Sequence, residues 1–150
     1  MEHTLAAEEK QSNRPTAMIR PKVMIVDDDP ALRQALHLRL RSVQYQTVCA
    51  SDGYSALSLA QRERPDVIIL DLGLPAGDGF AVLRHMQEFP NLALIPVIVL
   101  TARDPQGNKQ RALDAGAVAF FQKPADNNRL FCMIQLCLEH RALIDSELPS

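Results

Sequence analysis

The chain has 150 residues, of which 47% are hydrophobic and 23% charged, a composition that excludes disorder throughout and is typical of a globular domain. Its formal net charge of -2 gives no general attraction to nucleic acid or to anionic lipid, so we expect no direct DNA binding. The apolar stretches fall short of the roughly 20 residues that a membrane-spanning helix needs, and acidic residues near the start exclude a secretory signal. We therefore expect a cytoplasmic protein with no membrane contact.

The first residues differ in character from the rest. Residues 1–20 contain charged and small polar residues with Pro15 and no sustained periodicity, which predicts a flexible leader. We place the ordered domain at 21–142 and a C-terminal tail at 143–150. At this length no separate output domain fits beside a complete α/β core, so we expect a stand-alone domain.

Apolar runs alternate with helix-like segments in a βα pattern repeated five times. This alternation predicts an α/β fold, a doubly wound five-stranded parallel sheet with helices on both faces. Four runs, expected to be buried strands, end in polar residues: 23–26 in Asp27 and Asp28, 67–70 in Asp71, 97–100 in Thr101, and 118–121, after Gln122, in Lys123. Since the carboxyl ends of parallel strands share one rim where ligands bind, these side chains should converge.

Capping residues and apolar spacing predict five helices. They begin at Asp29–Pro30, at Ser51 or Asp52, at Asp78–Gly79, near Gln106 and at Asp126. The fourth, over 106–115, has little apolar material beyond Ala112 and Leu113, and Gly116 supplies its C-terminal stop. We expect this helix to be the least firmly anchored.

The carboxylates of Asp27, Asp28 and Asp71 should lie close together. Two such charges about 4 Å apart repel by roughly 4 kcal/mol at an effective dielectric near 20. A hard divalent cation relieves this repulsion, and Mg²⁺ suits the site because it takes one or two protein carboxylates and leaves positions for phosphate oxygens. With the cation present, Asp71 has the properties of an acyl-phosphate nucleophile. Lys123 and Thr101 offer a positive charge and a hydroxyl donor to phosphoryl oxygens.

Four segments in order, VMIVDDDP, VIILDLGLPAGDG, VIVLTA and GAVAFFQKP, resemble the response-regulator receiver domain of two-component signalling over about residues 22–140. The resemblance implies a flavodoxin-like, receiver-type fold. It implies that Asp71 is phosphorylated and that Asp27 and Asp28 bind Mg²⁺, for which Mn²⁺ substitutes, directly or through water. It also implies that the backbone carbonyl of Gly73 is a metal ligand.

The same resemblance assigns the remaining site residues. Thr101 and Phe120 fall at the hydroxyl and aromatic switch positions, Lys123 at the invariant amine, and Lys123–Pro124 at a bond that is cis in the family. The chain departs from the family pattern at three positions. Phe120 replaces the commoner tyrosine, Gly73 has no side chain over the phosphoryl site, and Arg103 places a long cation near its mouth.

The leading hypothesis is a stand-alone response regulator that accepts a phosphoryl group from a sensor histidine kinase or a histidine phosphotransfer protein. It signals to a downstream protein through the face of helix four, strand five and helix five, which also offers a possible homodimer contact. On this hypothesis the protein is not an enzyme beyond its own phosphorylation and dephosphorylation.

Two alternatives stay open. One is a receiver-like binding module that is not phosphorylated. The other, less favoured, is a phosphohydrolase with an aspartyl-phosphate intermediate, in which Asp27 and Asp29 would form a D-x-D pair after the first strand.

Overall fold

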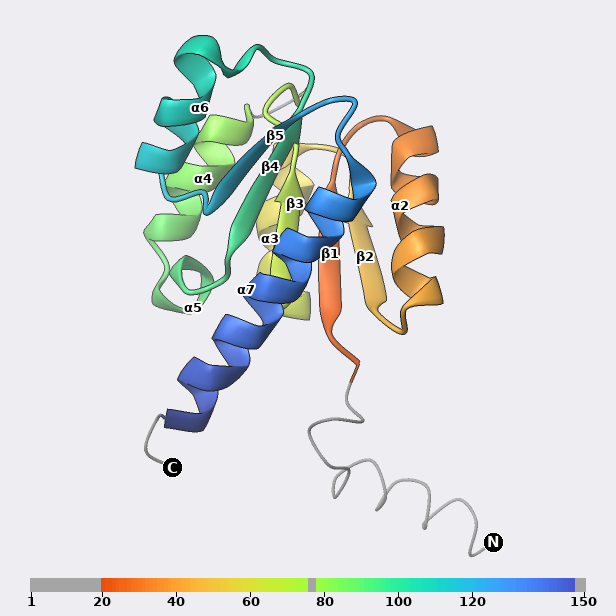
Figure 1. The fold of residues 1–150 in the computed structure, drawn as a ribbon. Helices are drawn as coiled ribbons and strands as arrows, with labels where there is room; N and C mark the ends of the chain where they lie inside the picture. The colour runs from red at the N-terminus through yellow and green to blue at the C-terminus, as the bar shows by residue number, and fades with distance from the viewer. Residues whose placement is uncertain (1–19, 76–77, 148–150) are drawn as a thin grey trace, which may run out of the picture.

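The computed structural model describes residues 20–75 and 78–147. Within them five parallel strands form one sheet in the order β2-β1-β3-β4-β5 (Figure 1). The strands are β1 (Lys22–Val26), β2 (Gln46–Ala50), β3 (Val67–Leu70), β4 (Val97–Thr101) and β5 (Ala119–Gln122). The helices are α2 (Pro30–Ser42), α3 (Gly53–Glu63), α4 (Gly79–Gln87), α5 (Pro90–Ala93), α6 (Pro105–Asp114) and α7 (Asn127–Glu147). The predicted doubly wound parallel sheet is confirmed.

Both faces of the sheet are covered, so the core has two halves (Figure 1). Helices α2 and α7 pack on one face, and α3, α4 and α6 on the other. Because successive side chains of a strand point to opposite faces, Ile68 enters one half and Ile69 the other, and both are buried. Continuous apolar strands such as β3 and β4 are therefore what this architecture requires.

The strand order places the rim residues. β1 pairs with both β2 and β3, so the direction of winding reverses there, and ligands of open α/β sheets bind at such a point. Val26 and Leu70 are register partners, and the amide of Asp71 donates a hydrogen bond of 2.9 Å to the carbonyl of Val26. The first residues beyond β1 and β3 are consequently neighbours.

Aspartates cap four of the helices as predicted. The Asp29, Asp78 and Asp126 carboxylates accept hydrogen bonds from amides in the first turns of α2, α4 and α7. For α3 the choice left open between Ser51 and Asp52 falls on Asp52, which accepts from the Ser55 amide at 2.7 Å. These bonds satisfy amides that have no partner within the helix.

Strand β5 differs from expectation. It was expected to be buried and to begin at Val118, but it begins at Ala119, and its first three residues are half-buried. The reason is its place at the edge of the sheet, where it has a strand neighbour on one side only. Phe120 and Phe121 do point to opposite faces, one into each half of the core.

Helix α6 is also less regular than predicted. The expected helix over 106–115 is interrupted at Gln106 and Gly107, whose ψ of 121° and φ of 80° are non-helical. These angles are those of a type II turn, in which glycine occupies the third position. Ala112 is the only buried residue of α6.

Of the two predicted domain boundaries, only the C-terminal one can be compared with the described residues. Helix α7 continues to Glu147, past the boundary expected at 142, so that boundary lies inside the helix. The guanidinium of Arg141 donates to the carbonyl of Leu94 at 3.5 Å, a contact that fixes this part of α7 to the end of α5. The leader lies outside the described residues except for residue 20, and the short helix α5 was not predicted.

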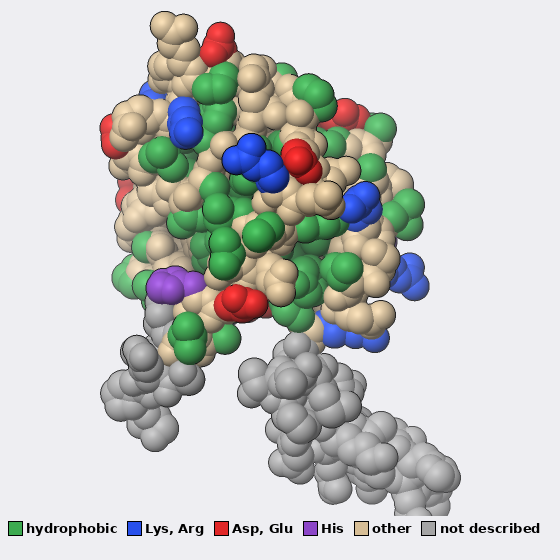
Figure 2. All heavy atoms as spheres, in the orientation of Figure 1, with side chains coloured by type: hydrophobic (Ala, Val, Ile, Leu, Met, Phe, Trp, Pro, Cys, Tyr) green, Lys and Arg blue, Asp and Glu red, His purple; other side chains and the backbone are tan. Residues whose placement is uncertain are grey.

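The described helices give no indication of a membrane span, since each is too short or too polar for one. On the face that carries α7, Lys and Arg side chains are scattered among acidic and apolar ones and form no single basic patch (Figure 2).

Candidate functional site

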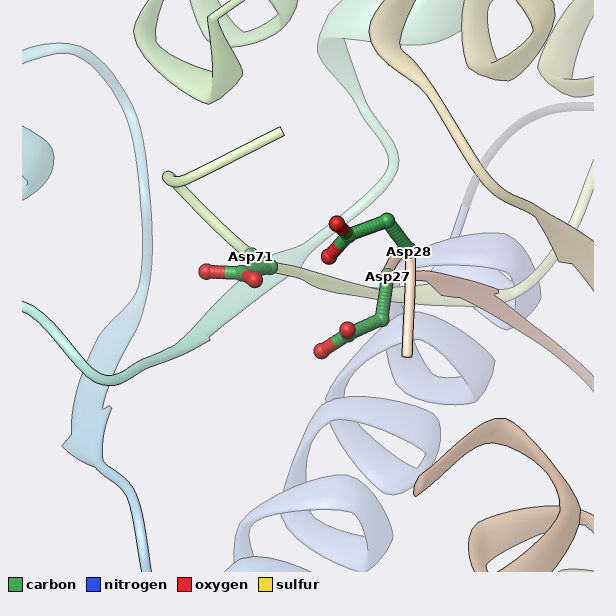
Figure 3. A group of neighbouring side chains, drawn as sticks. All are labelled: Asp27, Asp28 and Asp71. Carbon is green, nitrogen blue, oxygen red and sulfur yellow. The ribbon is translucent and has the colours of Figure 1, made fainter. Parts of the chain in front are cut away.

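Three carboxylates meet where β1 and β3 end (Figure 3). Asp27, Asp28 and Asp71 each offer an oxygen, and these oxygens lie within 4.8 Å of one another. Asp27 and Asp71 are 2% and 6% exposed, whereas Asp28 is exposed. The predicted acidic group is thus assembled, with two members largely removed from water and one facing it.

Backbone groups hold Asp71 in place. Its amide is bonded to β1, and its carboxylate Oδ1 accepts a hydrogen bond of 3.0 Å from the amide of Gly73. The other oxygen, Oδ2, lies 3.4 Å from the ammonium nitrogen of Lys123. Gly73 therefore does contact the site, through its N–H; metal ligation by its carbonyl stays a prediction.

Lys123 lies closer to Asp27 than to Asp71. Its Nζ is 2.7 Å from Oδ2 of Asp27, against 3.4 Å from Asp71. Burial lowers the pKa of Lys123, but the hydrogen bond and charge of Asp27, with a smaller effect of Asp71, outweigh it and raise the pKa above its usual value. The amine is therefore held in its charged form.

Burial has the largest effect on the pKa of Asp27. Loss of hydration raises the pKa of its carboxyl, although Lys123 and the amide of Asp29 both stabilise the anion. The neighbouring Asp71 carboxylate adds repulsion that also raises this pKa, so a further positive charge at the site would be favourable. A hard divalent cation fits this group of carboxylates, because carboxylate oxygens are the ligands that Mg²⁺ prefers.

Thr101 is brought beside Lys123 by the pairing of β4 with β5. The Lys123 amide donates a hydrogen bond of 2.7 Å to the carbonyl of Thr101. The Thr101 hydroxyl is buried, 1% exposed for the residue, and accepts the amide of Arg103 at 3.3 Å. The hydroxyl retains its own proton for donation to another acceptor.

The remaining predicted residues lie around this centre. Phe120 is half-buried against the core half formed with α3, α4 and α6, and the Lys123–Pro124 peptide bond is cis, the isomer that the resemblance implied. Asp29 caps α2 through a 3.0 Å bond from the Ala31 amide. That occupied oxygen weighs against Asp29 as the second carboxylate of a phosphohydrolase.

Two residues of the site were not singled out from the sequence. Arg33 donates through Nη1 to the carbonyl of Asp27 at 2.7 Å, a tertiary contact with no distinct sequence signal beyond its place one turn into α2. A Cβ on Gly79 would lie 2.5 Å from the carbonyl oxygen of Asp71, so α4 can begin against the end of β3 only because residue 79 lacks a side chain. The Asp78–Gly79 pair was the available signal.

Comparison with known proteins agrees with this geometry. The family model described as "Response regulator receiver domain" matches residues 23–135. The "Response regulator PleD" of Caulobacter vibrioides is 36% identical over 124 residues, which cover 83% of this chain and 27% of that protein. The "Transcriptional regulatory protein KdpE" of Mycobacterium tuberculosis is 43% identical over 102 residues, covering 68% of this chain and 44% of that protein. This chain thus spans between about a quarter and half of these relatives.

Solved structures extend the similarity to three dimensions. The chemotaxis response regulator CheY4 of Vibrio cholerae is 30% identical with a TM-score of 0.74, covering 80% of this chain and 100% of that one. The receiver domain of the sensor histidine kinase PA1611 of Pseudomonas aeruginosa, solved with a magnesium ion in its active-site cleft, has the same identity and TM-score over 81% and 99% of the two chains. The present chain belongs to the response-regulator receiver domains, the phosphoacceptor domains of two-component signalling.

Proposed function

We propose that this domain accepts a phosphoryl group on Asp71 from a sensor histidine kinase or a histidine phosphotransfer protein in a Mg²⁺-dependent reaction. The observation that carries the proposal is the position of the Asp71 carboxylate. It lies nearly buried at a strand end, with two further carboxylates within 4.8 Å and a lysine ammonium at 3.4 Å.

The chemistry follows from these positions. A carboxylate oxygen of Asp71 forms a bond to phosphorus as the bond from phosphorus to the donor's imidazole nitrogen breaks, and the imidazole leaves with the electron pair. Mg²⁺, held by Asp27, Asp28 and Asp71 with the Gly73 carbonyl, would offset the charge of the phosphoryl oxygens. Lys123 supplies a positive charge next to the accepting carboxylate, and Asp27 keeps that amine in place. Mn²⁺ would serve in place of Mg²⁺, as both are bound by oxygen ligands.

Output is proposed to pass through the face formed by α6, β5 and α7. When the Thr101 hydroxyl donates to a phosphoryl oxygen, the contacts of the β4–α6 loop change, and Phe120 on β5 can turn further inward. A downstream protein, or a second copy of this chain, would read the altered face. We propose no catalytic turnover of external substrates, and we place the domain in the cytoplasm with its kinase.

Intact-mass measurement tests the proposal most directly. Acetyl phosphate with Mg²⁺ should add a single phosphoryl group to the protein, and chelation of Mg²⁺ should prevent the addition. Asp71→Asn should remove the adduct. Asp78→Asn is the matched control, because Asp78 is an exposed aspartate on the same strand-to-helix segment and asparagine retains its capping of α4.

Two results would overturn the proposal. If neither acetyl phosphate nor a phosphorylated histidine donor modifies the wild-type chain, it is an unphosphorylated binding module. If the purified protein instead releases phosphate from a phosphomonoester over many turnovers, it is a phosphohydrolase.

A further inference from the structure

A second cluster of charged and aromatic groups lies between the phosphoacceptor loop and α6. Phe80, the second residue of α4, is 1% exposed, and the guanidinium carbon of Arg111 on α6 lies 3.8 Å from its ring centroid. The corresponding carbon of Arg103, from the loop after β4, lies 5.9 Å from the same centroid. Arg103 also forms an ion pair of 3.7 Å with Asp78. These four residues are called the Phe80 cluster below.

One end of the Phe80 cluster is fixed to the acceptor strand. The amide of Gly79 donates a hydrogen bond of 3.2 Å to the carbonyl of Leu72, and the close approach of Gly79 to the Asp71 carbonyl leaves no room for a Cβ. The ring of Phe80 follows directly and is enclosed by the core. Its position is therefore tied to the backbone of the phosphoacceptor.

The other end reaches the switch hydroxyl. The amide of Arg103 donates to Oγ1 of Thr101, so the arginine that approaches the Phe80 ring is bonded to the group that is proposed to turn toward a phosphoryl oxygen. A change in the hydrogen bonding of Thr101 would release that amide and with it one constraint on Arg103.

Helix α6 has few other anchors. Its start is broken at Gln106 and Gly107, and it buries only Ala112. The stack of Arg111 on Phe80 therefore joins α6 to α4, together with the packing of Ala112 in the same half of the core. A contact of this kind is strongest when the planar guanidinium lies over the ring face, which a lysine cannot reproduce.

We infer that Arg111 is a positioning residue that couples the phosphorylation state of Asp71 to the position of α6 through the Phe80 cluster. This inference rests on the function proposed above. A change in the hydrogen bonding of Thr101 alters the contact of Arg103 with the Phe80 ring. A shift of the ring then moves Arg111, and α6 with it. A group bound at Asp71 shifts the equilibrium between two positions of α6 only if its affinity differs between them. Coupling must therefore appear in the affinity of the site as well as in the position of α6.

The test uses beryllofluoride with Mg²⁺ as a stable stand-in for the phosphoryl group on Asp71. Hydrogen exchange is measured for the amides of α6 with and without this probe, and the affinity for the probe is measured in parallel. In the wild type the probe should change the exchange rates of α6. In Arg111→Ala, exchange without the probe should be about twofold to fivefold faster, as expected for loss of a cation–π contact made by an exposed arginine. The change caused by the probe should then shrink by a similar factor.

Matched variants separate coupling from a purely structural role. Lys109→Ala removes an exposed cation from the same helix, one without an ion pair or ring contact among the described side chains, and should behave as wild type. Arg111→Lys keeps the charge but not the planar stack and should lie between. A structural role alone would speed exchange equally with and without the probe and would leave the affinity for the probe unchanged.

The outcomes distinguish this inference from the proposed function. If the wild type does not bind beryllofluoride or accept a phosphoryl group, both are wrong. If Arg111→Ala binds the probe with wild-type affinity and shows the full wild-type change in α6, the coupling role of Arg111 is wrong and the phosphoacceptor function stands.

Discussion

At the scale of single residues, the site has one ammonium group, that of Lys123, which forms ion pairs with two buried carboxylates. Lys123 lies closer to Asp27, and the carboxylate of Asp71 keeps one oxygen on a backbone amide and one beside the amine. The third carboxylate, Asp28, faces water and has no short contact with Lys123 among the described ion pairs. The proposed divalent cation would therefore supply Asp28 with positive charge that Lys123 does not.

Asp28→Asn is expected to weaken Mg²⁺ binding. Ligand at one hundred times its dissociation constant stabilises the folded state by about 2.7 kcal/mol. Loss of one carboxylate charge should remove at least about 1.4 kcal/mol of this gain, equivalent to tenfold weaker binding. Urea unfolding with and without Mg²⁺ measures the difference. The neighbouring Asp29→Asn should retain the full gain, because Asp29 caps α2 and asparagine caps equally well. Equal loss in the two variants would show that Asp28 is not a specific ligand.

The raised pKa of Lys123 predicts a pH dependence at the alkaline end. A lysine whose folded-state pKa lies above its usual 10.5 contributes stability that is complete below that value and is lost as the pH rises through the folded-state pKa. The difference in unfolding free energy between wild type and Lys123→Met should therefore stay constant up to about pH 10 and shrink at higher pH. Urea unfolding of both proteins across this range measures it. A constant difference would show that the charge of Lys123 does not stabilise the fold.

At the scale of elements, α6 differs from the other helices that begin at an aspartate cap, because it is interrupted directly after the cap. Asp104 does cap it through the amide of Gln106, at 2.9 Å, but the chain then turns at Gly107 before the helix continues. At the other end, Gly116 has a φ of 113° and stops the helix as predicted. A helix with a turn at one end, a glycine at the other and one buried residue is suited to change position when its surroundings change.

Alanine at the two ends of α6 should therefore cost different amounts of stability. Gly107→Ala meets no neighbouring atom, and its cost is the strain of a positive φ, about 1–2 kcal/mol. Gly116→Ala should cost more, since its φ of 113° lies further from the left-handed region open to residues with a side chain, and the flexible end of Gln87, 2.6 Å from the Cβ position, would also have to move. Gly73→Ala, where a Cβ would make only a 3.8 Å contact, serves as the control and should change stability by less than about 0.5 kcal/mol. Urea unfolding ranks the three, and a different order would refute this account of α6.

At the scale of the whole molecule, stability depends on a sheet buried on both faces at its centre and less so at its edges. Ile68 and Ile69 are adjacent in β3 yet belong to separate halves of the core, whereas Val48 on the edge strand β2 is half-buried. The site lies at the end of the most buried strands, which keeps Asp27 and Asp71 in a rigid frame.

Truncation at the centre of the sheet should cost far more than at the edge. Ile68→Ala and Ile69→Ala should each reduce the unfolding free energy by about 2–5 kcal/mol, because each leaves a cavity in close-packed surroundings. Val48→Ala should cost less than either, as its side chain already contacts solvent. This order is measured from the denaturant midpoints of the three variants, provided that the slope of unfolding free energy against denaturant concentration stays the same. A small cost at only one of the two isoleucines would mean that one face is not a true core.

The local chemistry of the chain determined much of this picture. Apolar runs ending in polar residues predicted β1, β3 and β4 and the rim position of Asp71 and Thr101, because strand burial and strand ends depend on short-range pattern. Aspartates before helices predicted the caps at Asp29 and Asp78 for the same reason. The second strand, α5 and the extension of α7 carried weaker local signals and were placed only by the sheet and by contacts such as that of Arg141 with Leu94.

Tertiary structure decided which of these groups touch. No sequence pattern shows that Lys123 pairs more closely with Asp27 than with Asp71, that β5 is a half-exposed edge, or that Arg111 stacks on Phe80. Such contacts join residues far apart in the chain, and they depend on strand order and on the few ångströms by which helices shift in packing. The sequence by itself determined the chemical groups of a phosphoacceptor site, and the folded structure decided their partners, because distance and burial are properties of the packed molecule.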